Sequence, residues 1–374
     1  MSARKRLTVV QLLPALESGG VERSTIEIAQ ALVRAGHRAL VVSAGGRLVP
    51  ALEAVGAQHR QLDIGRKSLL TLRHVPALRR MLEDADADIV HARSRLPAWL
   101  GWRALRGLPA RQRPRWVTTV HGLNSPSRYS AIMASGERVI CVSQTVRDYV
   151  CRHYPQTDRE KLRVIPRGID PAAFPRRPHP DRDARAEVAA EFPALAGDGP
   201  RLLLPGRGTR LKGHADALAL LARLRAGGMD ARLWMPGLRE SGRERYLAEL
   251  EREAVAQGIA GAVAMTPPTS AIARAYAASD LVLQLSRKPE AFGRTVLEAL
   301  SVGRPVLGWE HGGVGEVLRE LAPNGAVAPF DIQALAARAH TLLAMPPDAA
   351  GTIPYTLSAM QDATLSVYDE LYDR

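Results

Sequence analysis

The sequence contains very little cysteine: only Cys141 and Cys151 occur among 374 residues. Neither is flanked by metal-binding spacings, and two residues cannot build a disulfide framework. No apolar run reaches the roughly 18 to 20 residues that a membrane-spanning helix needs. The N-terminus has a basic start, but Gln11 and Pro14 interrupt its apolar run and no cleavage site is clear. We therefore expect a cytoplasmic protein without a disulfide framework, a metal centre or a membrane span.

Lysine is also scarce, although the chain is strongly basic. Only five lysines occur, whereas the formal net charge is +13, so nearly all basic residues are arginines. Such a charge is typical of proteins that meet a polyanion: nucleic acid, an anionic membrane face or phosphorylated substrates. A compositional bias of the genome explains scattered arginines equally well. No helix-turn-helix, zinc finger or aromatic RNA-binding pattern accompanies the charge, so we expect no nucleic-acid partner.

Apolar strands and helices alternate in two successive parts of the chain. Segments such as LTVVQLL (7–13) and RWVTTVHG (115–122) are followed by helical patterns, which predicts βαβ units and parallel sheets. Residues 171–200 are rich in proline and charge, which predicts a linker with a short helix. The fold class is therefore α/β, with one domain over residues 1–170 and a second over 201–356. Such sheets bind ligands in a cleft at the carboxyl ends of their strands.

A glycine-rich loop follows the first strand, in the sequence SGGVER. Gly19 and Gly20 let a backbone approach a ligand closely, and the helix that follows presents its N-terminus to anions. The loop is not the dinucleotide fingerprint GxGxxG. A plain tight turn explains the same glycines, so the loop alone does not decide between the two interpretations.

The second domain begins with a strand and the basic loop PGRGTRLKGH. Arg207 and Lys212 lie at the carboxyl end of this strand, where a guanidinium fork and a compact ammonium suit a pyrophosphate. A solvated basic turn is the competing interpretation. The scarcity of lysine favours a functional Lys212.

Two histidines end predicted strands of the first domain. His121 ends RWVTTVHG and is followed by glycine, so it can hydrogen-bond a sugar hydroxyl or orient a reacting group. His91 ends the strand ADIVHAR in a similar way, but no partner is evident for it. A satisfied buried histidine is the competing interpretation for both, and it is favoured for His91.

The stretch EAFGRTVLEAL places two glutamates eight residues apart. A helix that begins near residue 292 or 293 offers the free N–H groups of Gly293, Arg294 and Thr295 to a phosphate. Glu290 then precedes the helix and can bind sugar hydroxyls, whereas Glu298 lies more than a turn inside it and can accept from ribose hydroxyls. A structural interpretation explains the pattern equally well: Glu290 would be a surface charge near the start of the helix, and Glu298 a paired, partly buried carboxylate.

This E-x7-E stretch resembles the signature of retaining GT-B glycosyltransferases of the family 4 type. Other stretches of the chain also resemble family segments and occur in the family's order, over roughly residues 8 to 345. They are GGVER, TTVHG, VICVSQTVRDYV, VIPRGID, GRGTRLKG, GGVGEVL and NGAVAPFDIQALA. The resemblance implies two Rossmann-like domains that face a central cleft. It also implies a nucleotide-sugar donor, no required metal or cofactor, and a C-terminal helix (about 357–373) that returns to the N-terminal domain.

The resemblance also implies roles for the candidate residues. Arg207 and Lys212 would hold the diphosphate, Glu290 the donor sugar and Glu298 the ribose. His121 would lie by the sugar, and the Gly19–Gly20 loop by the phosphate. The family retains anomeric configuration without a firmly established protein nucleophile, so Glu290 is not assigned that role. Arg167 is a departure, because the family more often has asparagine there.

The acceptor is expected to be a saccharide or glycolipid. The segment 99–116 carries three tryptophans and many arginines, which suits the interface of an anionic bilayer, here the inner membrane. An ordinary amphipathic helix with a basic outer loop is the competing interpretation. Together with the GGVER start, the segment is similar to the corresponding part of enzymes that build lipopolysaccharide core. The resemblance therefore implies lipopolysaccharide core as the acceptor, and we take a UDP-linked sugar as the default donor. A GT-B nucleotide-sugar epimerase and an inactive GT-B partner protein are the alternatives.

Overall fold

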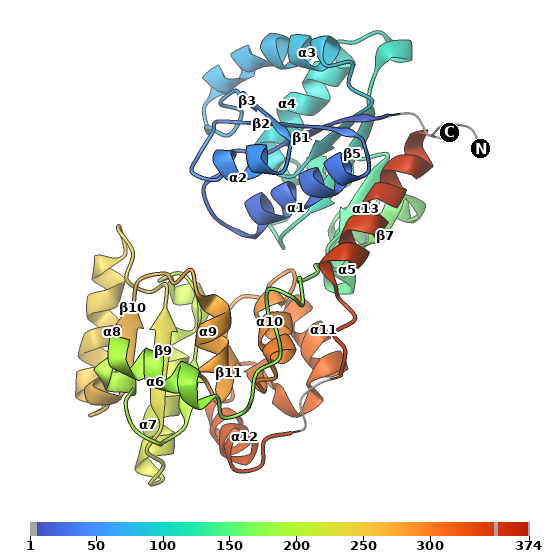
Figure 1. The fold of residues 1–374 in the computed structure, drawn as a ribbon. Coiled ribbons are helices and arrows are strands. Elements are labelled where there is room, and N and C mark those ends of the chain that lie inside the picture. Colours follow the sequence, from blue (N-terminus) through green and yellow to red (C-terminus); the bar gives the residue numbers. More distant parts are fainter. Residues whose placement is uncertain (1–5, 348–350, 373–374) are drawn as a thin grey trace. The chain divides into compact units, whose positions relative to one another are not determined.

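The computed structural model describes residues 6–347 and 351–372, which form two compact units. The first unit contains the described residues up to Arg167 together with those from Leu357 onward, and the second is Gly168–Thr356. Each is an α/β unit built around a parallel sheet (Figure 1). The α/β prediction is thus confirmed.

The sheet of the first unit has seven strands in the order β3-β2-β1-β4-β5-β6-β7. Its elements are β1 (Thr8–Leu12), α1 (Gly20–Arg34), β2 (Arg38–Ser43), α2 (Val49–Ala54), β3 (Gln58–Gln61), the 3₁₀ helix η1 (Leu69–His74), α3 (Val75–Asp84), β4 (Ile89–Ala92), α4 (Arg95–Arg106), β5 (Arg115–Val120), β6 (Arg138–Cys141), α5 (Gln144–His153), β7 (Leu162–Val164) and α13 (Leu357–Tyr372). The strand order reverses between β1 and β4, where doubly wound sheets bind their ligands.

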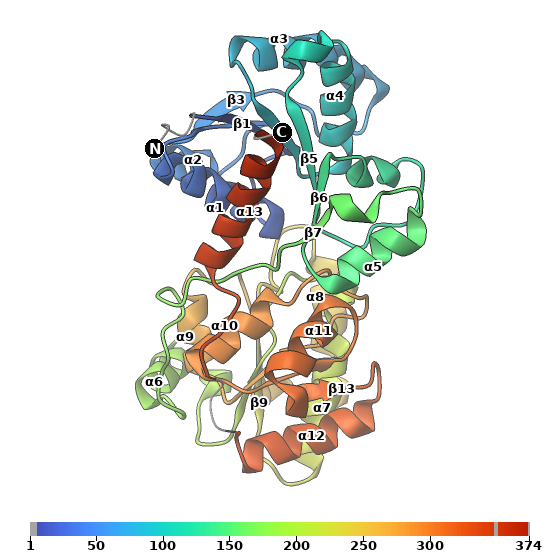
Figure 2. The same ribbon diagram turned by 90° about the vertical axis from the view of Figure 1, so that its right-hand side faces the viewer.

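Helix α13 packs beside α1 in the first unit (Figures 1 and 2). Its apolar residues Val367 and Leu371 join Val9 and Val41 of the sheet in one buried cluster. Polar contacts add to this packing: Glu370 forms ion pairs with two arginines of the sheet region, at 2.9 Å each. The C-terminal helix is therefore an integral part of the first unit's core.

The sheet of the second unit has six strands in the order β10-β9-β8-β11-β12-β13. Its elements are α6 (Arg182–Glu191), β8 (Arg201–Leu203), the 3₁₀ helix η6 (Arg210–Lys212), α7 (His214–Ala226), β9 (Arg232–Pro236), α8 (Glu244–Ala256), β10 (Val263–Thr266), α9 (Ile272–Ala277), β11 (Leu281–Gln284), α10 (Arg294–Val302), β12 (Val306–Trp309), α11 (Gly312–Leu321), β13 (Ala326–Val327) and α12 (Ile332–Ala344). Here the strand order reverses between β8 and β11.

Successive strand residues of the second unit face opposite cores. Leu202 and Leu283 pack with helices α7, α8 and α12, whereas Leu203 and Val282 pack with α6, α9, α10 and α11. Both faces of the sheet are covered, which is why most residues of its strands are apolar, with polar residues only at strand ends such as Arg201 and Gln284.

The segment that the sequence predicts as a linker, 171–200, is built into the second unit. Phe174 and Leu195 are buried in the core beneath α10. Arg304, whose side chain is 1% exposed, donates to the carbonyls of Pro178 (2.5 Å) and Ala277 (2.8 Å) and so ties this segment to the end of α9. Burial lowers the pKa of Arg304 to about 10.

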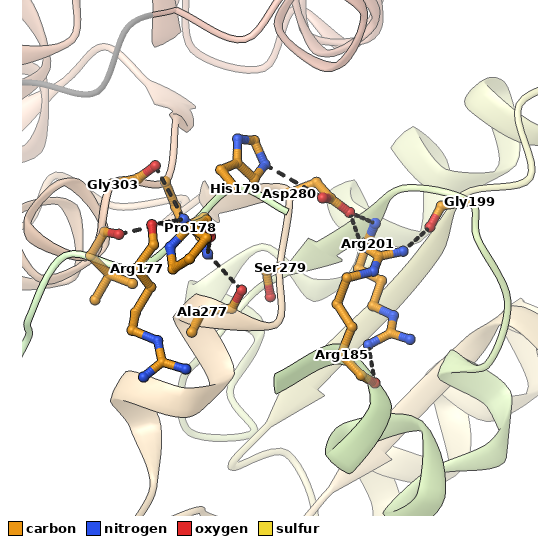
Figure 3. A network of polar contacts seen from close by, with 12 residues as sticks. Arg177, Pro178, His179, Arg185, Gly199, Arg201, Ala277, Ser279, Asp280 and Gly303 are labelled. Carbon is orange, nitrogen blue, oxygen red and sulfur yellow. Dashed lines mark hydrogen bonds and ion pairs between the residues drawn. The ribbon is translucent and has the colours of Figure 1, made fainter. Parts of the chain in front are cut away.

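A second set of polar contacts fixes the same segment to the sheet (Figure 3). Asp280 accepts from the backbone N–H of Arg201 at 2.7 Å and pairs with Arg185 and His179. Burial raises the pKa of Asp280, but these donors outweigh it and leave the pKa lowered. Arg185 also donates to the carbonyl of Gly199 at 2.8 Å. The predicted linker is thus a structural strap of the second unit.

Candidate functional site

Two loops meet at the carboxyl edge of the second unit's sheet. One follows β8 and the other follows β11, and these strands are neighbours at the switch point. The N–H of Arg287 donates to the carbonyl of Leu211 at 2.8 Å, which joins the loops through their backbones. Lys212 Nζ lies 2.6 Å from Glu290 Oε1 and joins them through side chains. The structure therefore brings two residues predicted from separate motifs into direct contact.

Glycines allow the close approach of these loops. Gly213 has a φ of 77°, and a Cβ there would lie 2.0 Å from the carbonyl oxygen of Leu285. Gly312, at the start of α11, has a φ of 60°, and a Cβ there would lie 2.6 Å from the carbonyl oxygen of Glu290. An alanine at either position would combine backbone strain with a steric clash.

Several groups hold the carboxylate and backbone of Glu290 in place. Its side chain accepts from the Ser286 hydroxyl as well as from Lys212, and its carbonyl accepts from Gly313 N–H at 2.7 Å. His311 Nε2 lies 2.7 Å from the carbonyl oxygen of Ser286. The sequence patterns do not indicate Ser286 or His311 as site residues, and Gly313 stands out only as part of the motif GGVGEVL.

Arg207 lies in the same loop as Lys212, but it is exposed. Within the part of the chain that the structure describes, its guanidinium has no hydrogen-bond or ion-pair partner. Gly206, just before it, has a φ of 157° and lies against the aliphatic stem of Lys212. The loop thus presents one paired cation and one solvated cation at the same edge of the sheet.

Helix α10 begins at Arg294, with Gly293 as its N-terminal cap, so it starts one or two residues later than predicted. Arg294 and Thr295 form its first turn and are half-buried. Glu298, in its second turn, is 7% exposed and accepts from Tyr276 Oη at 2.8 Å. Glu298 is therefore held by a tyrosine of α9, as the paired-carboxylate interpretation requires, and the structure does not test the ribose-binding role.

His214 follows directly after the Lys212 loop and is fully buried at the start of α7. Burial lowers its pKa to about 4, helped by the nearby Lys212 and opposed by a backbone group of Thr209. A neutral imidazole beneath this loop is therefore part of the folded state.

We expect this neutral imidazole to make the second unit sensitive to acid. A lowered folded-state pKa gives stability that is complete above the unfolded value near 6.5 and is lost as the pH falls towards 4. The contribution of His214 should fall by about 2 kcal/mol between about pH 7 and about pH 5. Urea unfolding at both pH values should show this loss, and His214→Phe should reduce it. An unchanged pH dependence in the variant would contradict the assignment.

The predicted residues of the first unit gather around the carboxyl ends of β1, β4 and β5. Gly19 has a φ of 142° and caps α1, whose first residue is Gly20. His121 follows β5 directly and is half-buried. Its Nδ1 lies 2.5 Å from Arg167 Nη2, and its Nε2 lies 3.4 Å from Arg93 Nη1. The sequence prediction did not include Arg93, which follows β4.

Two buried arginines therefore surround His121. Arg93 is 3% and Arg167 7% exposed, and both donate to the hydroxyl of Ser24 in α1, at 3.4 and 2.8 Å. Desolvation, with Arg167, Arg93 and His91 adding to it, holds the pKa of His121 well below its ordinary value.

His91 is a satisfied buried histidine, as the favoured interpretation predicts. Its Nδ1 lies 2.7 Å from Tyr368 Oη of α13, and its Nε2 lies 2.6 Å from Thr119 Oγ1. Burial lowers its pKa well below the ordinary value. Both ring nitrogens are engaged within the core, so His91 offers nothing to a ligand.

The tryptophans of the segment 99–116 are held within the first unit. Trp116 lies in β5, is 5% exposed and donates to Ser135 Oγ at 3.1 Å. Trp99 donates to the carbonyl of Tyr129 at 2.9 Å and packs edge-on against Trp102. Trp116 is therefore a core residue, whereas contact of the rest of the segment with a bilayer stays a prediction.

The described part of the chain contains no helix that is both long and apolar enough to cross a membrane. Residues 6–347 and 351–372 also contain no group of three or more His, Cys, Asp or Glu side chains placed to hold a metal ion.

Curated relatives match part of the chain. A D-inositol 3-phosphate glycosyltransferase of Jonesia denitrificans is 31% identical over 252 residues, which is 61% of this chain and 56% of that protein. The protein of the same name from Segniliparus rotundus is 28% identical over 58% of this chain and 46% of its own length. The chain thus spans about half the length of the curated relatives it matches.

Solved structures match nearly the whole chain. A glycosyltransferase of Rickettsia africae superposes with a TM-score of 0.83 at 26% identity and covers 99% of this chain and 100% of that one. Anabaena HepE in complex with UDP has a TM-score of 0.77 at 21% identity, over 98% and 99% of the two chains. WaaG, a glycosyltransferase involved in lipopolysaccharide biosynthesis, has a TM-score of 0.68 at 19% identity, over 98% of each chain, and supports the fold alone.

Two family models cover most of the chain between them. Residues 18–173 match Glycosyltransferase Family 4, and residues 187–356 match Glycosyl transferases group 1. The first match lies almost entirely in the first structural unit, and the second match lies within the second unit. The chain therefore belongs to the GT-B glycosyltransferases, with a family 4 region followed by a group 1 region.

Proposed function

We propose that this protein is a glycosyltransferase that moves a sugar from a nucleotide-sugar donor to a saccharide or glycolipid acceptor. The observation that carries the proposal is the contact between Lys212 and Glu290 at the switch point of the second unit, with Arg207 in the same loop. Two cations at the carboxyl edge of a parallel sheet suit the diphosphate of a nucleotide sugar.

The charges of this edge match the charge that develops during transfer. A departing nucleoside diphosphate gains negative charge, and Lys212, Arg207 and the N-terminus of α10 would stabilise it. Glu290 would bind the donor sugar and Glu298 the ribose. In this scheme the reaction needs no metal and retains the configuration of the sugar, as the family resemblance implies.

We propose a UDP-linked donor. Solved GT-B structures of the same fold include Anabaena HepE with UDP and with UDP-glucose. For the acceptor, we propose a phosphorylated saccharide, free or part of an envelope glycolipid such as lipopolysaccharide core. The curated relatives named D-inositol 3-phosphate glycosyltransferase and the net charge of +13 support an anionic acceptor.

Release of nucleoside diphosphate tests this function. Purified protein is incubated with UDP-, GDP- and ADP-linked sugars, each alone, with inositol 3-phosphate and with lipopolysaccharide core saccharide. Faster release of UDP with one acceptor, together with glycosylated acceptor, is the expected result. Nucleotide binding without transfer would favour an inactive GT-B partner protein. Conversion of the sugar without an acceptor would favour an epimerase.

We also propose that the first unit contacts an anionic membrane surface through η1. Leu69 and Leu70 of η1 are 87% and 70% exposed. The basic residues Arg66, Lys67 and Arg73 flank them and are exposed too. Exposed apolar side chains bordered by cations suit the interface of an anionic bilayer.

Replacing Leu69 and Leu70 together by serine should weaken binding to phosphatidylglycerol-containing vesicles by about tenfold or more, because each buried leucine contributes about 1.5–3 kcal/mol. Co-sedimentation measures the change. Val255→Ser, which removes another exposed apolar side chain (69%) in α8, should leave binding unchanged. Equal binding by wild type and the double variant would exclude η1 as the contact.

A further inference from the structure

The contact between Arg167 and His121 restricts the chemistry of the imidazole. Arg167 Nη2 lies 2.5 Å from Nδ1 of His121. An arginine side chain carries hydrogen-bond donors and no acceptor, and it stays charged at any ordinary pH. Nδ1 must therefore supply the lone pair that this short contact requires.

This assignment leaves a single position for the ring hydrogen. A neutral imidazole carries one N–H, so a lone pair on Nδ1 places the hydrogen on Nε2. A protonated ring would direct a second N–H at a guanidinium and would lose the contact with Arg167. Nε2 lies 3.4 Å from Arg93 Nη1 and 3.5 Å from Arg167 Nη2, so both of its contacts with the guanidinium groups are much longer than the 2.5 Å contact at Nδ1.

The two arginines are themselves held by a scaffold from β1 and α1. Arg93 Nε donates to Gln11 Oε1 at 2.7 Å, and Gln11 Nε2 donates to the carbonyl of Thr25 at 3.1 Å. Arg167 Nη1 donates to Ser24 Oγ at 2.8 Å. These contacts orient both guanidinium groups independently of any ligand.

The charged groups around the histidine favour its neutral state. Arg93 and Arg167 face the ring, and neutral His91 lies nearby on β4. Glu27 of α1 and Tyr368 of α13 act on Arg93, whose pKa burial lowers to about 10. Two buried cations beside one imidazole oppose a third positive charge.

We infer that Arg167 and Arg93 are positioning residues that hold His121 as a neutral hydrogen-bond donor through Nε2, and that His121 is not the base of the reaction. The role in turnover rests on the proposed function, whereas the protonation state does not. The partner of Nε2–H would be an oxygen of the substrate, either a sugar hydroxyl or a phosphate oxygen.

Heteronuclear NMR of protein labelled at the histidine ring nitrogens tests the inference without any substrate. His121→Gln identifies the His121 signals by their loss. We expect a hydrogen on Nε2 and none on Nδ1, with protonation of the ring only well below the ordinary histidine pKa. A hydrogen on Nδ1, or an ordinary titration of His121 in the wild type, would overturn the inference.

Variants of the arginine separate positioning from a general effect on the fold. In Arg167→Met, His121 should take up a proton at least about tenfold more readily, because an adjacent positive charge is removed. Arg167→Lys keeps the positive charge, so His121 should stay mostly neutral in this variant. The lysine variant also provides a test if Arg167→Met does not fold. Arg73→Gln removes an exposed charge of η1 and should leave the His121 signals unchanged. A protonation of His121 that is the same in all three variants would contradict a positioning role.

Turnover provides a separate readout. Glutamine can donate from a place near that of Nε2 but cannot act as a base, so His121→Gln should retain at least about tenfold more activity than His121→Ala. Equal loss in both variants would contradict the donor role. If the wild type transfers no sugar, the proposed function fails, while the NMR result still decides the protonation state.

Discussion

Replacing Lys212 by alanine is expected to lower kcat/KM for sugar transfer by about 100-fold to 1,000-fold, with the fold unchanged. The ammonium is the paired cation at the switch point of the second unit, 2.6 Å from Glu290. Removing one preorganised donor from a site of developing negative charge costs catalysis about this much. The side chains of the pair are 31% and 26% exposed, so their loss should change stability by no more than about 1 kcal/mol.

Steady-state kinetics with the donor identified by the panel, together with a thermal melt, measures both effects. Arg210→Ala is the matched control, because Arg210 lies in the same 3₁₀ helix but pairs with Glu249 and stacks over Tyr246. The control should retain kcat/KM within about threefold, since an exposed charge that pairs with Glu249 and not with Glu290 contributes little. Full activity of Lys212→Ala would show that the diphosphate does not bind at this loop.

Replacing Arg304 by alanine should destabilise the second unit by roughly 3 kcal/mol or more. The guanidinium is buried and donates to the carbonyls of Pro178 and Ala277, which would lose their partners. Each buried carbonyl left without a hydrogen bond costs about 1–3 kcal/mol. For a unit of this size, the melting temperature should fall by roughly 6–12 °C.

Differential scanning calorimetry measures this fall. Arg182→Ala is a suitable control, because Arg182 is exposed at the start of α6 in the same strap. Its melting temperature should stay close to that of the wild type. An equally small change of the melting temperature in Arg304→Ala would contradict the prediction. It would mean that apolar residues such as Phe174 and Leu195 are sufficient to hold the strap.

The sequence allowed a prediction of the α/β class because the strands are short apolar runs that alternate with helices. Strand β5 lies where the pattern RWVTTVHG places it, and α10 begins at Arg294, one or two residues after the start predicted from EAFGRTVLEAL. The strap is different. Its proline and charge content predicts a linker, but the buried contacts of Arg304 and Asp280 that fix it come from far along the chain.

The candidate site shows the same division. The sequence predicted Lys212 and Glu290 separately, through strand ends and a motif, and the adjacency of β8 and β11 brings them together. It did not predict Arg93, because the strand ADIVHAR gives no sign that its last residue contacts His121. Contacts of this kind depend on which strands become neighbours, and local patterns do not carry that information.

The return of α13 to the first unit has a consequence for how the protein is made. A ribosome synthesises the first unit's sheet early, but the helix that supplies Tyr368 and Glu370 to it is made only after the whole second unit. Domains of multidomain chains generally fold from the N-terminus onward during synthesis. Here the order of completion is reversed: the unit that begins first must wait, with the α13-binding part of its core uncovered, until the other unit has left the ribosome.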